Sequence, residues 1–438
     1  MDLLKDNVGK LYRKFFIASF GSALIACIYG LVDMAMVGQY HGPDGSAAMA
    51  VIAPIWNIIY SFGLLCGIGG SVIYAVARGE RDDVKAANGY FTSAFILGTL
   101  WALILWVLVW VCEEPLLRLF GANDALMPLC KEYMVATKLT VPVYVFINLL
   151  SSFLRNDGDP GRATKAVIFG GIFNVFGDYF FVFTLDMGIK GAGIATAMGA
   201  SMSVLVMLTH FISKKNTLKF VKPLRILNSF KMISVNGFSS FIVDVAMGIA
   251  TMLFNRRVME YLGTDALAVY GVIVVVGTLV QCCSYGIGQA AQPVISRNFG
   301  AGLTDRIKTM LKYNIITAAV FGAIWTVLSM AMPQVFIKLF MTPTPEVLSI
   351  APGIIRIYAI SFVLLPFNIY STYYFQAIMR AKISLIASVA RGIVISGALI
   401  LLLPVAFGGN AVWWAMPITE AVVFVYSAVM MKKVKLSR

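Results

Sequence analysis

Four acidic residues interrupt long apolar stretches of the sequence: Asp33, Asp178, Asp244 and Glu420. A carboxylate far from water loses hydration when it is ionised, and a proton or a bound cation compensates that loss. Each residue could therefore switch between a protonated, a metal-bound and an organic-cation-bound form. We consider all four as candidates for ion coupling or cation recognition.

Asn174 and Asp178 are four residues apart, so a helix would place them on one face. Thr196, in the next apolar segment, could add a hydroxyl, and Asp33 a second carboxylate. Together the four would form an oxygen-rich pocket suited to a proton or, as metal ligands, to Na⁺. The alternative is that Asn174 and Thr196 only form hydrogen bonds between helices.

The remaining charged residues allow two readings each. Asp244 either has a function or pairs with a base such as Arg391, whereas Glu420 and Arg391 could instead pair structurally with each other. Lys138 and Arg356 lie near the ends of their segments, and their long side chains are expected to reach the membrane interface.

Some aromatic and methionine side chains could contact a flat cationic ligand through cation–π or soft contacts. Core packing is the alternative for each of them. The candidates are Met34, Met36, Tyr144, Tyr370 and Tyr374.

These residues must be positioned by membrane helices. Hydrophobic residues make up 59% of the 438 positions and charged residues 13%, whereas a soluble domain carries about 25% charged residues. A bilayer-spanning helix needs about 20 mostly apolar residues. We therefore predict an all-α polytopic membrane protein whose first partner is the lipid bilayer. The twelve expected spans are 13–38, 48–77, 88–112, 132–154, 165–185, 190–212, 230–255, 265–296, 309–332, 350–377, 384–404 and 411–431.

The basic residues predict the topology. With both termini on one side, 26 of the 35 Lys and Arg residues fall on that side, six on the other and three within helices. The positive-inside rule then makes both termini cytoplasmic, in a multi-pass protein of the cytoplasmic membrane. This topology accounts for the net charge of +14 without a nucleic-acid partner.

The two halves of the chain resemble each other. Gly67-Ile68-Gly69 recurs as Gly286-Ile287-Gly288, and Leu119-Phe120 as Leu339-Phe340. Such parallel repeats are related by an axis along the membrane normal, with the substrate between them. We expect a six-helix lobe over 1–212, a basic cytoplasmic linker over 213–231 and a second six-helix lobe over 232–438.

Motifs for enzyme chemistry are missing from the sequence. There is no GxxxxGK[ST] phosphate-binding loop and no HExxH zinc motif. The six cysteines contain no CxxC pair and read as small packing residues. We expect no catalytic residues and no cofactor.

Five segments, taken in order across the two halves, form a recognisable pattern: Leu31–Gly38, Asn174–Asp178, Lys190–Thr196, Gly286–Ala301 and Tyr374–Ile378. In these segments the chain resembles the multidrug and toxic compound extrusion (MATE) transporters, particularly their MepA-like bacterial branch.

The resemblance implies a V-shaped pair of six-helix bundles, monomeric and in a bacterial inner membrane, that exports hydrophobic organic cations in exchange for H⁺ or Na⁺. In relatives, a cation site is built from residues matching Asp33, Asn174, Asp178 and Thr196. Segment 350–377 lacks the acid that some relatives carry there, and Asp244 does not align cleanly with their other acid. A second cation site therefore gains no support.

Two alternative functions stay open. A lipid-linked precursor flippase would share the architecture but would need a more cationic central cavity for its diphosphate. A membrane-embedded enzyme would form a product without any ion gradient, and no motif in the sequence supports it.

Overall fold

The structure is a computed structural model that describes residues 2–81, 83–223, 225–341 and 343–436. Every regular element within these ranges is helical. Eleven of the helices are long and apolar enough to cross a membrane, with the 75-residue helix α8 counted once.

The first half contains seven α-helices and three short irregular helical segments. The 3₁₀ and π segments interrupt or end helices that the sequence predicts as continuous. The elements are α1 (Val8–Arg81), α2 (Val84–Val111), α3 (Glu113–Leu119), α4 (Met127–Thr137), η1 (Lys138–Thr140), α5 (Val141–Asn156), α6 (Pro160–Asp178), η2 (Tyr179–Thr184), α7 (Gly188–Leu208) and η3 (Thr209–Ile212).

The second half repeats this plan. A long first helix is again followed by helices that break near their middle. The elements are α8 (Ile226–Gly300), α9 (Thr304–Ala331), α10 (Pro333–Phe340), α11 (Pro345–Ala359), α12 (Ser361–Ala377), α13 (Ala381–Val389), η4 (Ala390–Val394), α14 (Ile395–Phe407), η5 (Gly409–Trp414) and α15 (Ala415–Lys433).

Helices α1 and α8 each fold into two spans at a glycine. Gly42 has a φ of 64° and Gly263 a φ of 80°, a backbone conformation that is easy only for glycine. The chain reverses at both positions, so each long helix supplies two of the twelve expected spans. The two turns also occupy corresponding places in the two halves.

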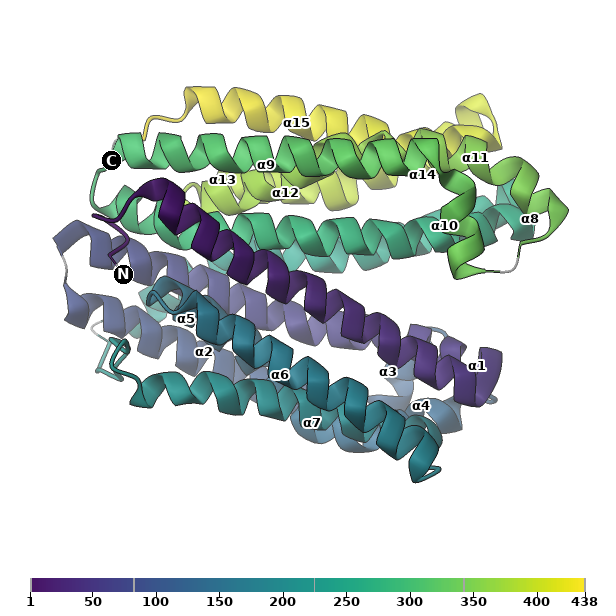
Figure 1. The fold of residues 1–438 in the computed structure, drawn as a ribbon, viewed down its shortest axis with the longest axis horizontal. Helices are drawn as coiled ribbons and strands as arrows, with labels where there is room; N and C mark the ends of the chain where they lie inside the picture. The colour runs from purple at the N-terminus through teal and green to yellow at the C-terminus, as the bar shows by residue number, and fades with distance from the viewer. Residues whose placement is uncertain (1, 82, 224, 342, 437–438) are drawn as a thin grey trace.

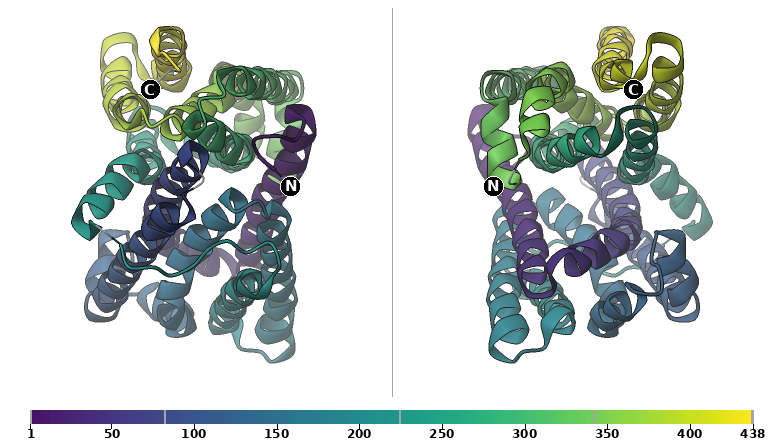
Figure 2. Two further views of the ribbon diagram at one scale, coloured as in Figure 1. Left: turned by 90° about the vertical axis from the view of Figure 1, so that its left-hand side faces the viewer. Right: turned by 90° about the vertical axis from the view of Figure 1, so that its right-hand side faces the viewer.

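The helices gather into two lobes that form a V (Figure 1). The lobes are close at the end that holds both chain termini and diverge toward the other end. Views along the long axis show α1 and α8 lying between the remaining helices of the two halves (Figure 2).

The lobes touch through glycines at the end with the termini. A Cβ on Gly69 would lie 2.2 Å from the Ile233 carbonyl oxygen, and one on Gly237 would lie 2.0 Å from that of Leu65. A Cβ on Gly300 would lie 2.0 Å from the Val76 carbonyl oxygen. Backbone thus packs directly on backbone, as small residues permit between membrane helices. We call these contacts the glycine seam.

The linker between the lobes is shorter than predicted. Helix α8 begins at Ile226, so the last six residues of the expected linker 213–231 are helical. Its first part is bound to the first lobe: Lys219 N donates to Asn88 Oδ1 at 3.1 Å and Val221 N donates to Thr92 Oγ1 at 3.0 Å.

Candidate functional site

The first lobe brings the predicted pocket residues together. Thr196 Oγ1 on α7 donates to Asp33 Oδ2 on α1 at 3.4 Å, and Asn174 Nδ2 on α6 donates to Thr196 Oγ1 at 3.2 Å. Tyr133 on α4 contacts both, with its hydroxyl 3.3 Å from Asp33 Oδ2 and 3.3 Å from Thr196 Oγ1. Asp178 is the last residue of α6, one turn after Asn174, and its side chain is completely buried.

Several oxygen atoms of this pocket have no partner among the described residues. They are Asp33 Oδ1, Asn174 Oδ1 and both carboxylate oxygens of Asp178, all buried. A buried acceptor without a hydrogen bond costs about 1–3 kcal/mol, and more if it is charged. A proton or a small hard cation between the two carboxylates would remove that cost.

Close packing of α6 against α7 sets the geometry. A Cβ on Gly199 would lie 2.6 Å from the Gly170 carbonyl oxygen, and one on Gly177 would lie 2.9 Å from Ala195 Cβ. These contacts bring Asn174 within reach of Thr196. The π-helical segment η2 starts directly after Asp178, and such irregular turns are frequent at functional sites.

Tyr133 is a pocket residue that sequence reasoning missed. It is buried and lies on the short helix α4, before the break at η1. Its apolar segment contains other aromatic residues, so residue type alone gave no signal. The helix break at η1, just after α4, could be suspected only from Pro142, which follows η1 in the sequence.

Arg391 in the second lobe was expected to pair with either Asp244 or Glu420. Arg391 Nε donates to Glu420 Oε1 at 2.8 Å, so these two pair with each other. Asp244 is not paired with Arg391: it accepts from the Tyr285 hydroxyl at 2.6 Å. Asn368 Nδ2 donates to the other carboxylate oxygen of Glu420 at 2.6 Å.

The candidate ligand-contacting residues fall in different surroundings. Tyr370 and Tyr374 are buried in the core of the second lobe, which fits packing. Met34 is 40% exposed. Met36 is half-buried, and the half-buried Tyr144 packs at a tilt against Trp56 with ring centroids 4.8 Å apart.

Lys138 forms an ion pair in the first lobe. Its ammonium lies 2.7 Å from Glu113 Oε2 and 4.8 Å from the centroid of the Trp110 ring. The side chain is therefore held in an ion pair at the place where α2 ends and α3 begins. Arg356 is exposed, and its Nε donates to the Met330 carbonyl oxygen at 3.1 Å.

The family follows from a comparison of the whole chain. The MatE family model matches residues 18–180 and 236–401, a stretch in each lobe. The chain belongs to the MatE family. Multidrug export protein MepA of Staphylococcus haemolyticus is 24% identical over 427 residues, which cover 95% of this chain and 92% of that protein. Its counterpart in Staphylococcus saprophyticus is 23% identical over 426 residues, with the same coverage.

Solved MATE structures share the fold. An outward-facing conformation of a multidrug resistance MATE family transporter of the MOP superfamily matches with a TM-score of 0.89 and 22% identity, over 98% of this chain and 97% of that chain. A MOP superfamily transporter from Pyrococcus furiosus matches with a TM-score of 0.88 and 22% identity, over the same shares. The predicted all-α fold of two six-helix bundles is thereby confirmed.

Arg155 connects the two lobes of this MatE protein. The span predicted at 132–154 ends one residue before it, so the sequence placed Arg155 in a loop. It lies in the last turn of α5 and is buried. Its Nη1 donates to Gln289 Oε1 on α8 at 2.5 Å, and its Nη2 donates to Ser22 Oγ on α1 at 3.4 Å. The hydrogen bonds of this buried guanidinium therefore help to fix the position of one lobe relative to the other.

Proposed function

We propose that this protein is a secondary active multidrug exporter that antiports hydrophobic organic cations against H⁺ or Na⁺. The observation that supports this proposal most directly is the pocket of Asp33, Asn174, Asp178 and Thr196, in which several buried oxygens have no hydrogen-bond partner among the described residues. The names of the MepA relatives support multidrug export, and membership of a transporter family supports transport over catalysis.

Alternating access supplies the mechanism. The organic cation enters between the lobes in a state open toward the cytoplasm and leaves in a state open outward. The coupling ion binds at Asp33 and Asp178 and favours one of these states. Exchange requires only that the two ligands stabilise different states of one protein.

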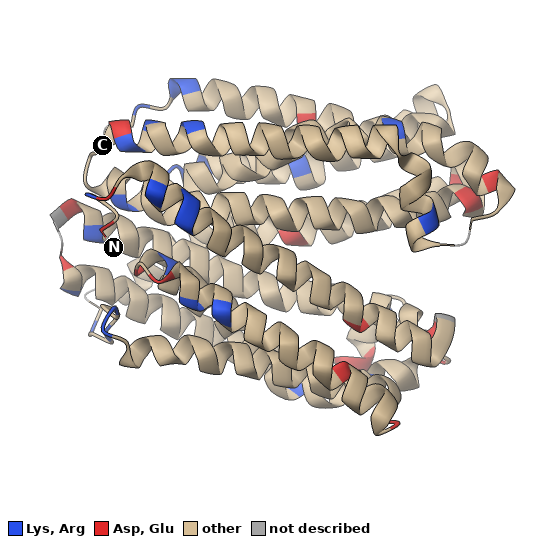
Figure 3. Ribbon diagram, viewed as in Figure 1, with Lys and Arg blue, Asp and Glu red and all other residues tan. Residues whose placement is uncertain are grey.

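The distribution of charge supports the orientation in the membrane. Lys and Arg gather at the end of the V that holds the termini (Figure 3), which by the positive-inside rule faces the cytoplasm. We infer a monomer in a bacterial cytoplasmic membrane, with both termini inside.

The proposal is tested by uptake of ethidium into inside-out proteoliposomes under a pH gradient or a Na⁺ gradient. The parent protein should accumulate ethidium under one gradient, which identifies the ion. Asp33→Asn and Asp178→Asn should lose this uptake, because an amide cannot alternate between a charged and a neutral form. Glu260→Gln, at an exposed position outside the pocket, should retain it.

Full gradient-driven uptake by both pocket variants would refute the assignment of the pocket. Absence of uptake under either gradient would move the proposal to a lipid-linked precursor flippase. Lipid translocation would then be the assay.

A further inference from the structure

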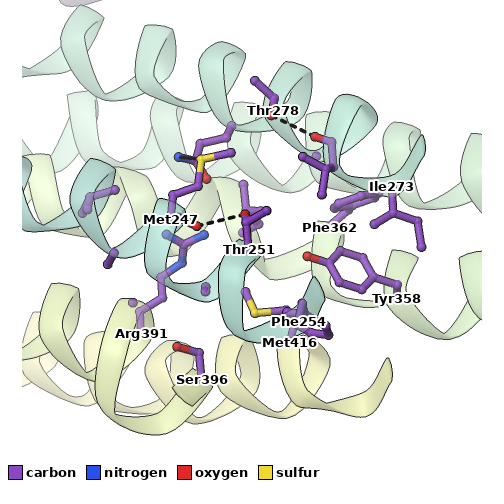
Figure 4. A pocket seen from close by; sticks show the side chains of 18 of the residues that line it. Met247, Thr251, Phe254, Ile273, Thr278, Tyr358, Phe362, Arg391, Ser396 and Met416 are labelled. Carbon is purple, nitrogen blue, oxygen red and sulfur yellow. Dashed lines mark hydrogen bonds between the residues drawn. The ribbon is translucent and has the colours of Figure 1, made fainter. Parts of the chain in front are cut away.

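A cavity lies inside the second lobe, apart from the pocket at Asp33 (Figure 4). Both spans of α8 line it, together with α11, α12, η4, α14 and α15. Much of its wall is apolar and aromatic, including Phe254, Tyr270, Tyr358 and Phe362. Such a wall suits a flat hydrophobic ligand.

Arg391 is the one charged residue among those that line the cavity. Its Nε is bonded to Glu420, but its two Nη atoms form no hydrogen bond with any residue that the structure describes. Figure 4 shows the guanidinium directed toward Met247, which also lines the cavity. Two donors of a fixed planar group are therefore available to a ligand.

A second polar group in the wall lacks a partner. Ser396 is completely buried, lines the cavity and has an unsatisfied Oγ among the described residues. A buried hydroxyl without a hydrogen bond is destabilising unless a ligand satisfies it. Ser396 and Arg391 are both on the wall formed around the π-helical segment η4.

We propose that this cavity binds the carboxylate end of an amphipathic aromatic anion or zwitterion, with the Arg391 Nη atoms as its donors. The planar guanidinium matches a carboxylate in bidentate geometry, and the aromatic wall holds the rest of the ligand. Because the ion pair with Glu420 balances the charge of Arg391, the preference for a carboxylate rests on the directed donors of the guanidinium rather than on net charge. The proposal adds a substrate class to the proposed transporter, on which it rests for its physiological meaning, but binding itself requires no gradient.

The test measures binding of a matched pair of fluorescent probes to the purified full-length protein in lipid nanodiscs. The probes are 7-(diethylamino)coumarin-3-carboxylate and its carboxamide, which differ in the one negative charge. The parent protein should bind the carboxylate at least about tenfold more tightly, since a hydrogen bond to a charged group contributes enough free energy for that ratio.

Three variants connect the preference to the cavity. Arg391→Lys keeps a cation beside Glu420 but removes the forked donors, so the preference for the carboxylate should be weaker than in the parent. Ala250→Phe fills the cavity, which Ala250 lines, without touching the ion pair, so both probes should bind weakly. Arg356→Lys makes the same exchange in the same lobe outside the cavity and should bind like the parent.

Equal binding of the two probes by the parent, or a preference as strong in Arg391→Lys as in the parent, would overturn the proposal. If Arg391→Lys does not fold, unchanged binding by Ala250→Phe overturns it instead. Failure of the antiport proposal appears separately, as absence of ethidium uptake under both gradients.

Discussion

Asp159 lies between α5 and α6, at the end of the first lobe that holds the termini. Arg162 Nε lies 3.0 Å from Asp159 Oδ2, and Lys215 Nζ lies 3.2 Å from its Oδ1. Burial alone would raise the pKa of Asp159, but the hydrogen bonds from Arg162 and Lys215 outweigh it and lower the pKa. The ionised side chain thus stabilises the folded lobe and the start of the linker.

The pH dependence of this contribution has a definite sign. A lowered pKa in the folded state stabilises the protein above the ordinary carboxyl range, and the benefit is lost as pH falls through the folded pKa. Asp159→Asn should lower the free energy of unfolding at neutral pH by about 1–3 kcal/mol. The difference from the parent should shrink below about pH 4.

Thermal unfolding in detergent at a series of pH values checks this. Asp305→Asn is the control, because Asp305 is 96% exposed and lies 3.8 Å from Lys308. A loss of stability in Asp159→Asn that is constant down to acid pH would contradict the assigned role.

At the residue scale, sequence predicted what depends on type and spacing. Asp33 and Asp178 were identified because acids are rare within apolar segments, and Asn174 by its helical spacing from Asp178. Tyr133, Arg155 and the pair of Lys138 with Glu113 depend on which side chains face each other across helices. Spacing along one segment does not contain that information.

At the scale of elements, the turns at Gly42 and Gly263 permit a stability prediction. Replacing Gly263 by alanine places a Cβ at a φ of 80°, which costs about 1–2 kcal/mol. Gly263→Ala should therefore lower the melting temperature of the purified protein.

Gly248 provides the control for this variant. It lies in the same helix, a Cβ at this position would have no other atom within 4 Å, and its φ is not positive. Gly248→Ala should be neutral or stabilising, because alanine favours helix over glycine. Equal destabilisation by both variants would show that the turn geometry at Gly263 is not the cause.

The elements themselves were predicted well where long apolar runs dominate. The span expected at 88–112 overlaps α2, and the span expected at 309–332 overlaps α9. The breaks did not follow from hydropathy: η1 and η4 lie inside expected spans, and η2 forms the end of one. Local backbone geometry of this kind is decided by packing between helices.

At the scale of the whole molecule, the glycine seam predicts a conformational bias. Gly69→Ala would place a Cβ 2.2 Å from the Ile233 carbonyl oxygen, so the lobes could not approach as closely at this end. The variant should favour the state that is open at the end with the termini, and exchange between states should slow.

Energy transfer between fluorophores on Lys85→Cys and Lys308→Cys, in a cysteine-free background, measures this opening. Both positions are exposed and lie in different lobes at the seam end. Transfer should be lower in Gly69→Ala than in the parent. Gly30→Ala, which meets nothing within 4 Å, should leave it unchanged; an equal change in both would exclude the seam as its origin.

The bound linker limits how the second lobe can travel. Hydrogen bonds hold the chain to the first lobe as far as Val221, and α8 begins at Ile226. Fully extended, this stretch reaches about 18 Å. While those bonds persist, the start of α8 stays within that distance of Val221. The movement of the second lobe is therefore restricted most strongly at this corner.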